Sequence, residues 1–191
     1  MEHSSYQIAG DTSEIEAIMK KELLSVSRTY VKTNETKICS SESALVVDLG
    51  TCVSVVLSGI TSDGQLYFGA NHLFKSRDEN SDKSLEQISS LYNELHDRKV
   101  TRIQCIGVFG AGYREKSLAS QVAQNNIITV LETLSLYKLD IEIFQTGFSQ
   151  GLLLYHSQSL DSIVVRLKNL GDRTFTYYKL PVKKIFSIAK R

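Results

Sequence analysis

The chain has 191 residues, and its 22 lysines and arginines against 21 aspartates and glutamates give a formal net charge of +1. This length fits one globular domain with short appendages, and the near-zero charge argues against a strongly basic nucleic-acid-binding protein. No apolar run approaches the roughly 20 residues that span a bilayer, so no membrane insertion is expected. The first residues lack the charged and then apolar pattern of a secretory signal.

The N-terminal segment has the pattern of an amphipathic helix over about 12–28. Its apolar residues recur at helical spacing: Ile15, Ile18, Met19, Leu23 and Val26. We therefore predict an N-terminal extension over 1–29 that packs on the following domain as a helix. The alternative is a partly disordered leader.

The rest of the sequence alternates between segments with the periodicity of strands and segments with the periodicity of helices. A β-branched run at 44–59 and a second run at 65–74 flank an Asp-Gly turn signal and predict a hairpin. Helical periodicity follows at 84–98 and 117–138, and further strands are predicted at 102–109, 140–146, 151–157 and 162–168. This order predicts an α+β fold over 30–170, a layered α/β sandwich of mixed, largely antiparallel sheet with two long helices. Residues 171–191 are predicted to form a basic C-terminal tail.

Cysteine usage indicates the compartment. Cys39, Cys52 and Cys105 are an odd number, and no pair has the spacing of a zinc or redox motif. A disulfide framework is not expected at this count, so we predict a cytoplasmic protein. The four histidines are scattered, and no spacing indicates a metal site or another cofactor.

One cysteine stands at a break in an apolar strand. Gly50 and Thr51 precede Cys52, and a glycine there lets the chain turn and present the thiol. The backbone N–H groups of Thr51 and Cys52 are then predicted to face a developing oxyanion. In the predicted hairpin, the residue numbers of two paired positions add up to about 127. His72 is therefore expected opposite Val55 and near Cys52. A thiol beside an imidazole is the arrangement of a cysteine nucleophile, with the pKa of Cys52 expected below the ~8.5 of a free thiol.

The alternative for each of these residues is a structural role. Buried free cysteines are common and inert, and Cys39 and Cys105 both read as structural. His3, His96 and His156 read as surface or packing residues. Asn126 lies in an apolar stripe of the second long helix, where a buried amide must find hydrogen-bond partners or cost about 1–3 kcal/mol.

Several short motifs, in order, resemble one family. Residues 49–55 (Leu-Gly-Thr-Cys-Val-Ser-Val) resemble the Leu-Gly-Ser-Cys-Val-Ala-Val signature of the CheD family of chemoreceptor glutamine deamidases. Residues 70–73 are similar to the segment that carries the family's histidine, and 109–112 to its Phe-Gly-Gly-Ala. Asn126 matches the asparagine that opens the family's long helix. The resemblance covers roughly 30–168.

This resemblance implies a Cys52–His72 pair that hydrolyses glutamine side chains without a cofactor. The family has a threonine six residues before its cysteine, thought to orient the histidine, and Val46 stands at that position. More distant cysteine deamidase toxins, of the cytotoxic necrotizing factor type, are similar in fold and hold the histidine by a valine backbone carbonyl. The Val46 carbonyl is therefore the expected acceptor for one ring N–H.

Three functions follow as hypotheses. The first is a protein-glutamine deamidase whose substrates are methyl-accepting chemotaxis receptors, with a CheC-type phosphatase as a regulatory partner. The second keeps the chemistry in a secreted bacterial effector that deamidates a host protein. The third is a CheD-like binding module that has lost turnover.

Overall fold

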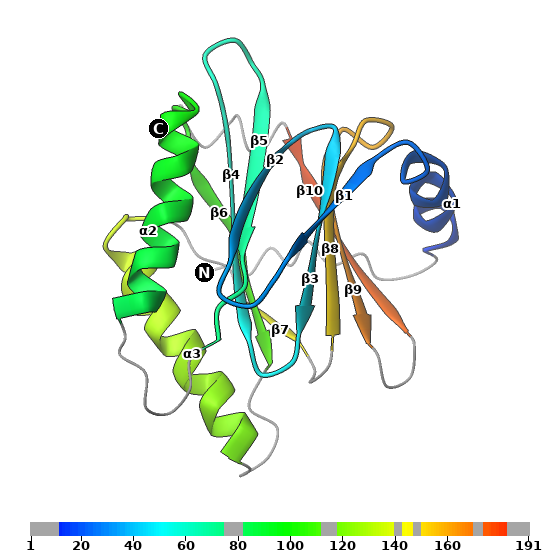
Figure 1. Cartoon of the computed structure of the whole chain (residues 1–191). Helices are drawn as coiled ribbons and strands as arrows, with labels where there is room; N and C mark the ends of the chain where they lie inside the picture. The colour runs from blue at the N-terminus through cyan, green and yellow to red at the C-terminus, as the bar shows by residue number, and fades with distance from the viewer. Residues whose placement is uncertain are drawn as a thin grey trace, which may run out of the picture.

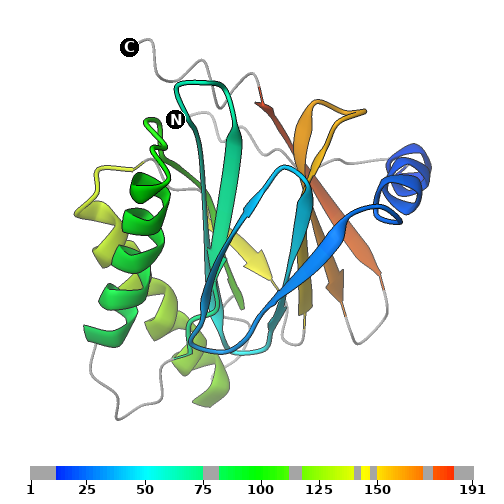
Figure 2. The ribbon, with the colours of Figure 1, turned by 45° about the horizontal axis from the view of Figure 1, so that its top comes forward.

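The computed structural model describes residues 12–74, 82–111, 118–139, 143–146, 150–169 and 174–182. Two five-stranded sheets lie face to face, with two long helices on the outer side of one sheet and a short helix on the outer side of the other (Figure 1). The same four layers can be followed when the molecule is tilted (Figure 2). The predicted α+β layered sandwich is therefore confirmed.

The first sheet, sheet A, has the strand order β1-β3-β8-β9-β10. These strands are β1 (Ser27–Val31), β3 (Ser43–Leu49), β8 (Gln150–Ser157), β9 (Ser162–Asn169) and β10 (Phe175–Pro181). All neighbours pair antiparallel except β1 and β3, which are parallel.

The second sheet, sheet B, has the order β2-β5-β4-β6-β7. Its strands are β2 (Thr36–Ser40), β5 (Leu66–Asn71), β4 (Val53–Ile60), β6 (Gln104–Ala111) and β7 (Ile143–Thr146). Only β6 and β7 are parallel. The predicted mixed and largely antiparallel pairing is found in both sheets.

The described residues also form three helices, which complete the layers: α1 (Ser13–Glu22), α2 (Asp82–Asp97) and α3 (Leu118–Ser135). The outer face of sheet B packs on α2 and α3, and the outer face of sheet A packs on α1 (Figure 1). None of the helices in the described part of the chain is long and apolar enough to cross a bilayer.

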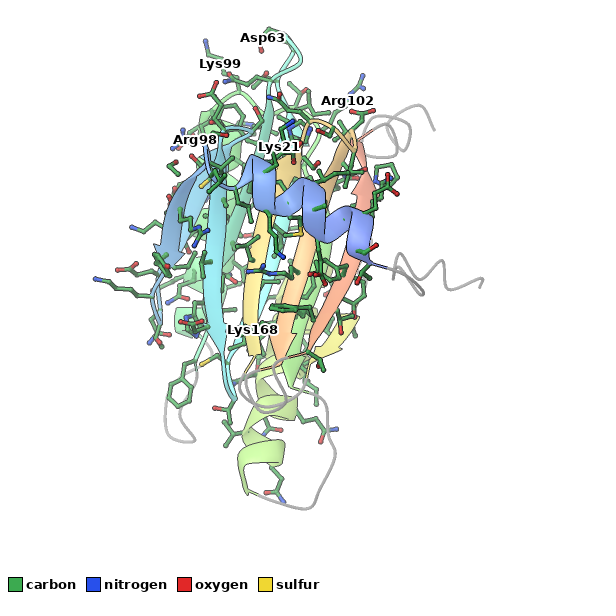
Figure 3. The ribbon with its side chains drawn as sticks, turned by 90° about the vertical axis from the view of Figure 1, so that its right-hand side faces the viewer. Lys21, Asp63, Arg98, Lys99, Arg102 and Lys168 are labelled. Atoms are coloured by element: carbon green, nitrogen blue, oxygen red, sulfur yellow. The ribbon has the colours of Figure 1, made fainter. Side chains whose placement is uncertain are left out.

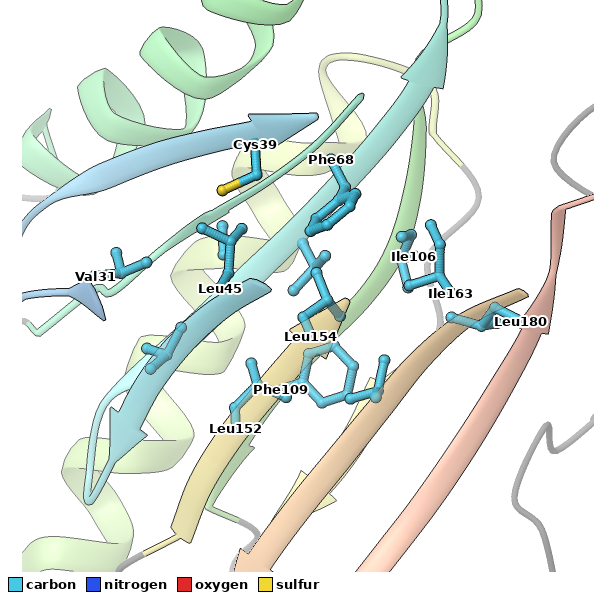
Figure 4. Packing of buried hydrophobic residues seen from close by; sticks show 14 of the residues in the cluster. Val31, Cys39, Leu45, Phe68, Ile106, Phe109, Leu152, Leu154, Ile163 and Leu180 are labelled. Atoms are coloured by element: carbon cyan, nitrogen blue, oxygen red, sulfur yellow. The ribbon is translucent and has the colours of Figure 1, made fainter. Parts of the chain in front are cut away.

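The largest core lies between the two sheets, and we call it the inter-sheet core (Figure 4). Side chains alternate between the two faces of each strand, so every second residue enters this core. Its residues include Leu45, Val47, Phe68, Phe109, Leu152, Leu154 and Ile163, most of them fully buried.

Two predicted boundaries are wrong. The predicted strand 44–59 is two strands in different sheets, because the chain leaves sheet A after Leu49 and enters sheet B at Val53. The predicted helix 12–28 ends at Glu22, and the apolar residues that follow help to bury α1 rather than extend it.

Three of the four edge strands, β1, β2 and β10, are not predicted from the sequence, whereas the fourth, β7, lies within the predicted strand 140–146. β1 begins inside the predicted helix 12–28 and β2 precedes the first predicted strand, while β10 lies inside the predicted basic tail, where it pairs along its whole length with β9. Edge strands carry fewer apolar residues than central strands because one side faces solvent, so their alternation is weak in the sequence.

Candidate functional site

The chain crosses from one sheet to the other at the predicted site. β3 ends at Leu49, β4 begins at Val53, and Cys52 lies in the link between them. A Cβ at Gly50 would meet nothing within 4 Å, so this glycine relieves no steric conflict in the structure. The change of sheet, rather than a glycine-dependent turn, brings Cys52 to the rim of the inter-sheet core.

The register of β4 and β5 sets which side chains face one another. Val53 and Leu73 exchange two backbone hydrogen bonds of 2.9 and 2.7 Å, so Ser54 lies opposite His72 and Cys52 opposite Phe74. The residue numbers of paired positions therefore add up to 126, so the register differs by one residue from the predicted one. A one-residue shift moves a side chain to the other face of the sheet. In the observed register, Cys52, Ser54 and His72 share the face that looks into the inter-sheet core.

The imidazole of His72 is held by a backbone carbonyl of the opposite sheet. Its Nδ1 lies 3.1 Å from the carbonyl oxygen of Val31, at the end of β1. A carbonyl oxygen only accepts, so Nδ1 carries the proton and Nε2 holds the lone pair. The ring is 5% exposed, and Nε2 is buried with no hydrogen-bond partner among the residues that the structure describes.

The backbone of His72 is fixed by the turn between β1 and β2. Its N–H donates to the Glu35 carbonyl (3.0 Å), and its own carbonyl accepts from the Asn34 N–H (2.6 Å). On the other side of the strand, the Asn71 Oδ1 accepts the N–H of Val55 at 2.7 Å. Backbone and ring are therefore both held, which orients Nε2.

The expected role of the Val46 carbonyl is wrong. Val46 lies in the middle of β3, where its backbone pairs with Tyr30 and Leu153. Its side chain packs on the outer face of sheet A with the residues beneath α1. The acceptor is a valine carbonyl, but it belongs to Val31. Nothing in the sequence signalled Val31, because its proximity to His72 depends on how β1 joins sheet A.

The pKa shifts of His72 and Cys52 both favour the uncharged form of the side chain. Burial lowers the pKa of His72 despite the Val31 hydrogen bond and the nearby Asp48 carboxylate, so the ring is neutral at neutral pH. Burial raises the pKa of Cys52, and a hydrogen bond from the backbone of Gly50 offsets this only in part. The expected lowering of the Cys52 pKa is therefore wrong. Desolvation of the thiolate outweighs the local dipoles.

Asn126 supports the link that carries Cys52. It lies in the middle of α3 rather than at the start of the helix, and it is 3% exposed. Its Nδ2 donates to the carbonyl oxygen of Thr51 at 3.3 Å. The buried amide therefore has the partner that its burial requires. Thr51 itself was predicted to offer its N–H to an oxyanion, and no backbone hydrogen bond between described residues occupies that N–H.

No hydrogen bond joins Cys52 to His72, although the two side chains are diagonal neighbours on one face of sheet B. The hydroxyl of Ser54, opposite His72, is also buried and has no hydrogen-bond partner in the described part of the chain. Buried polar atoms in folded proteins are nearly always paired with protein or water. Two such polar atoms therefore lie near the half-buried thiol of Cys52.

The other candidates lie elsewhere. Cys39 is 6% exposed in the inter-sheet core, and burial raises the pKa of Cys105 to about 12. His96 is exposed near the end of α2, His156 lies on β8, and His3 falls outside the described residues. Within the described ranges, no three His, Cys, Asp or Glu side chains are grouped closely enough to hold a metal ion.

The thiols should differ in reactivity towards iodoacetamide. We expect Cys52 to be alkylated first in the folded protein, because Cys39 is buried and burial raises the pKa of Cys105 to about 12. Since burial also raises the pKa of Cys52, its labelling should be slower than in the unfolded chain and should accelerate as the pH rises. Peptide mapping after short labelling measures the order. Labelling of Cys39 or Cys105 before Cys52 would contradict it.

No protein-family model matches the sequence, and no curated protein is significantly similar to it. Among solved structures, the C-terminal domain of CNFy from Yersinia pseudotuberculosis aligns with 80% of this chain and 61% of that domain. The aligned residues are 10% identical, and the TM-score is 0.36. The chain thus spans less than two thirds of the domain that it is compared with, and the likeness is distant.

Proposed function

We propose that this protein is a protein-glutamine deamidase in which Cys52 is the nucleophile and His72 the general base. One observation carries the proposal: the Val31 carbonyl fixes the tautomer of His72, which leaves the basic Nε2 unpartnered on the face that Cys52 shares. An imidazole held in this way has no structural partner for Nε2. It is arranged to accept a proton.

The proposed reaction needs only these two side chains and water. His72 Nε2 takes the proton of the Cys52 thiol, and the sulfur attacks the side-chain carbonyl carbon of a glutamine. The tetrahedral intermediate collapses with loss of ammonia, which takes a proton from Nε2 and leaves a thioester. Water, deprotonated by Nε2, then cleaves the thioester, which gives glutamate and restores the thiol. The raised pKa of Cys52 means that the thiolate forms during the reaction rather than before it.

The substrate is expected to be a glutamine on the surface of another protein. Phe74, opposite Cys52, is 37% exposed and offers an apolar contact beside the thiol. Chemotaxis receptors are the first substrates to test, on the strength of the sequence motifs, and a CheC-type phosphatase is the partner that these motifs suggest. A host protein deamidated by a secreted effector is the alternative target of the same chemistry.

The test is ammonia release and the mass increase of amide-to-acid conversion on two panels of substrates. One panel contains cytoplasmic fragments of chemotaxis receptors, and the other contains candidate host proteins. Peptide mapping then locates the converted glutamine. Conversion in either panel that requires Cys52 supports the chemistry and identifies the target class, and a lack of conversion in both panels opposes the proposal.

A second candidate function is a binding module without turnover. Two observations favour it: no hydrogen bond joins the Cys52 thiol to His72, and burial raises the pKa of that thiol. Catalytic hydrogen bonds are often long in free enzymes and tighten in the complex, which reconciles the same observations with an enzyme. Accumulation of a covalent adduct on Cys52 with a glutamine-derived electrophile separates the two functions.

Substitution of Val46 by threonine should leave the deamidation rate unchanged within a factor of about two. The new hydroxyl would lie beneath α1 on the outer face of sheet A, away from His72. It should instead lower stability by about 1–3 kcal/mol if it finds no partner there. Urea unfolding and initial rates measure both effects. A clear rise in activity would show that the hydroxyl reaches His72 and would contradict the structure.

Substitution of Asn126 by aspartate should reduce both stability and activity. The carboxylate would face the Thr51 carbonyl with no hydrogen to donate, and a buried charge without a partner costs several kcal/mol. The link that presents Cys52 would then lose its support. Asn125→Asp is the matched control, because Asn125 is exposed on the same helix. Equal effects of the two substitutions would oppose a positioning role for Asn126.

A further inference from the structure

A cavity of about 210 Å³ lies between α1 and the outer face of sheet A. Figure 3 shows α1 lying across the strands of this sheet. Three cationic side chains line the cavity, Lys20, Arg28 and Arg166, against one carboxylate, Glu16. Its apolar wall includes Met19 and Leu23, which are buried beneath the helix. We call this cavity the α1 pocket.

The cations of the α1 pocket form no ion pair with any carboxylate of the described residues. Within the described ranges, the only ion pair closer than 4.0 Å joins Lys37 to Glu35, which lie elsewhere. The carboxylate of Glu16 is already engaged, because it accepts hydrogen bonds from the hydroxyls of Thr12 (3.4 Å) and Tyr177. Burial and the Glu16 charge raise the pKa of Tyr177 to about 12, so its hydroxyl remains a donor. The pocket therefore has an excess of positive charge.

Arg166 is the best-placed of the three cations. It projects from β9 on the face opposite to Val165 and Leu167, and its guanidinium carbon lies 4.9 Å from the centre of the Phe175 ring. Its Nε is buried and has no hydrogen-bond partner among the described residues. A buried guanidinium N–H without an acceptor is costly, so an acceptor supplied by a bound ligand would be stabilised at this point.

We propose that the α1 pocket binds a small organic oxyanion, a phosphate monoester or a carboxylate on a compact apolar body. The planar fork of an arginine matches two oxygens of such a group, and Lys20 and Arg28 add charge at the opening. The cavity is smaller than the roughly 300–1,000 Å³ of sites for drug-sized ligands, so a small molecule fits it better. Met19 and Leu23 supply the apolar wall that the body of the ligand contacts.

Calorimetric titration with phenyl phosphate tests the proposal at constant ionic strength. Benzoate carries a carboxylate on the same body, inorganic phosphate lacks the body, and phenol lacks the charge. We expect saturable binding of phenyl phosphate or benzoate, and the tighter of the two identifies the oxyanion. Inorganic phosphate and phenol should each bind at least about tenfold more weakly, since each loses one class of contact.

The variants Arg166→Gln and Arg28→Gln should each weaken binding by about tenfold or more. Arg102→Gln is the matched control, because Arg102 is an exposed arginine outside the α1 pocket (Figure 3). If Arg166→Gln unfolds by circular dichroism, Arg28→Gln decides. No saturable binding, or equal weakening by Arg102→Gln, overturns the proposal. Neither result bears on deamidation, because the α1 pocket lies on the face of sheet A that is turned away from Cys52 and His72.

Discussion

Replacement of Cys52 by alanine is expected to abolish glutamine deamidation, with a rate at least about 10³-fold below that of the unaltered protein. The sulfur forms the bond to the substrate, so nothing in the site replaces it. The fold should persist, because Cys52 is a half-buried residue at the rim of the inter-sheet core rather than a member of its interior. Ammonia release under single-turnover conditions measures the loss.

Cys39→Ala is the matched control for this substitution. Cys39 is buried in the inter-sheet core, so its truncation should cost more stability than that of Cys52 while the deamidation rate is retained. Full activity in a folded Cys52→Ala protein would show that another group is the nucleophile. Ser54, whose buried hydroxyl faces His72, would then be the next residue to replace.

Replacement of His72 by alanine is expected to lower the rate by about 10²–10⁴-fold, the usual contribution of a general acid–base group. His96→Ala, which changes an exposed histidine, should have no effect. An unchanged rate in folded His72→Ala would assign the base to another residue.

The pH dependence of kcat/KM and of the free energy of unfolding provides a second test of the role of His72. Burial holds its pKa below the ordinary value of about 6.5, so Nε2 stays unprotonated and kcat/KM should fall only at pH values below 6.5. A histidine with a lowered pKa in the folded state stabilises the protein above its unfolded pKa, and this stabilisation is lost as the pH falls through the folded pKa. The free energy of unfolding should therefore decrease below pH 6.5, and less so in His72→Ala. A rate profile with an acid limb above pH 6.5 would contradict this assignment.

Local periodicity in the sequence is sufficient to predict many of the helices and strands. The two long helices, the apolar central strands and the layered α+β class all come from patterns that repeat over a few residues. The same is true of the choice of Cys52 and His72 as candidates, which rested on residue type, a break in a strand and short motifs. These features need no information about distant parts of the chain.

The relative positions of Cys52 and His72 depend on long-range contacts that local sequence patterns do not reveal. The step from sheet A to sheet B after Leu49, and a register that differs by one residue, place Cys52 and His72 on one face of sheet B. The acceptor for the imidazole is the carbonyl of Val31 rather than that of Val46. Every residue has a backbone carbonyl, so the sequence does not indicate which carbonyl accepts this hydrogen bond. The direction of the Cys52 pKa shift could not be predicted from the sequence either, because it depends on how much water the packed sheets exclude from the thiol.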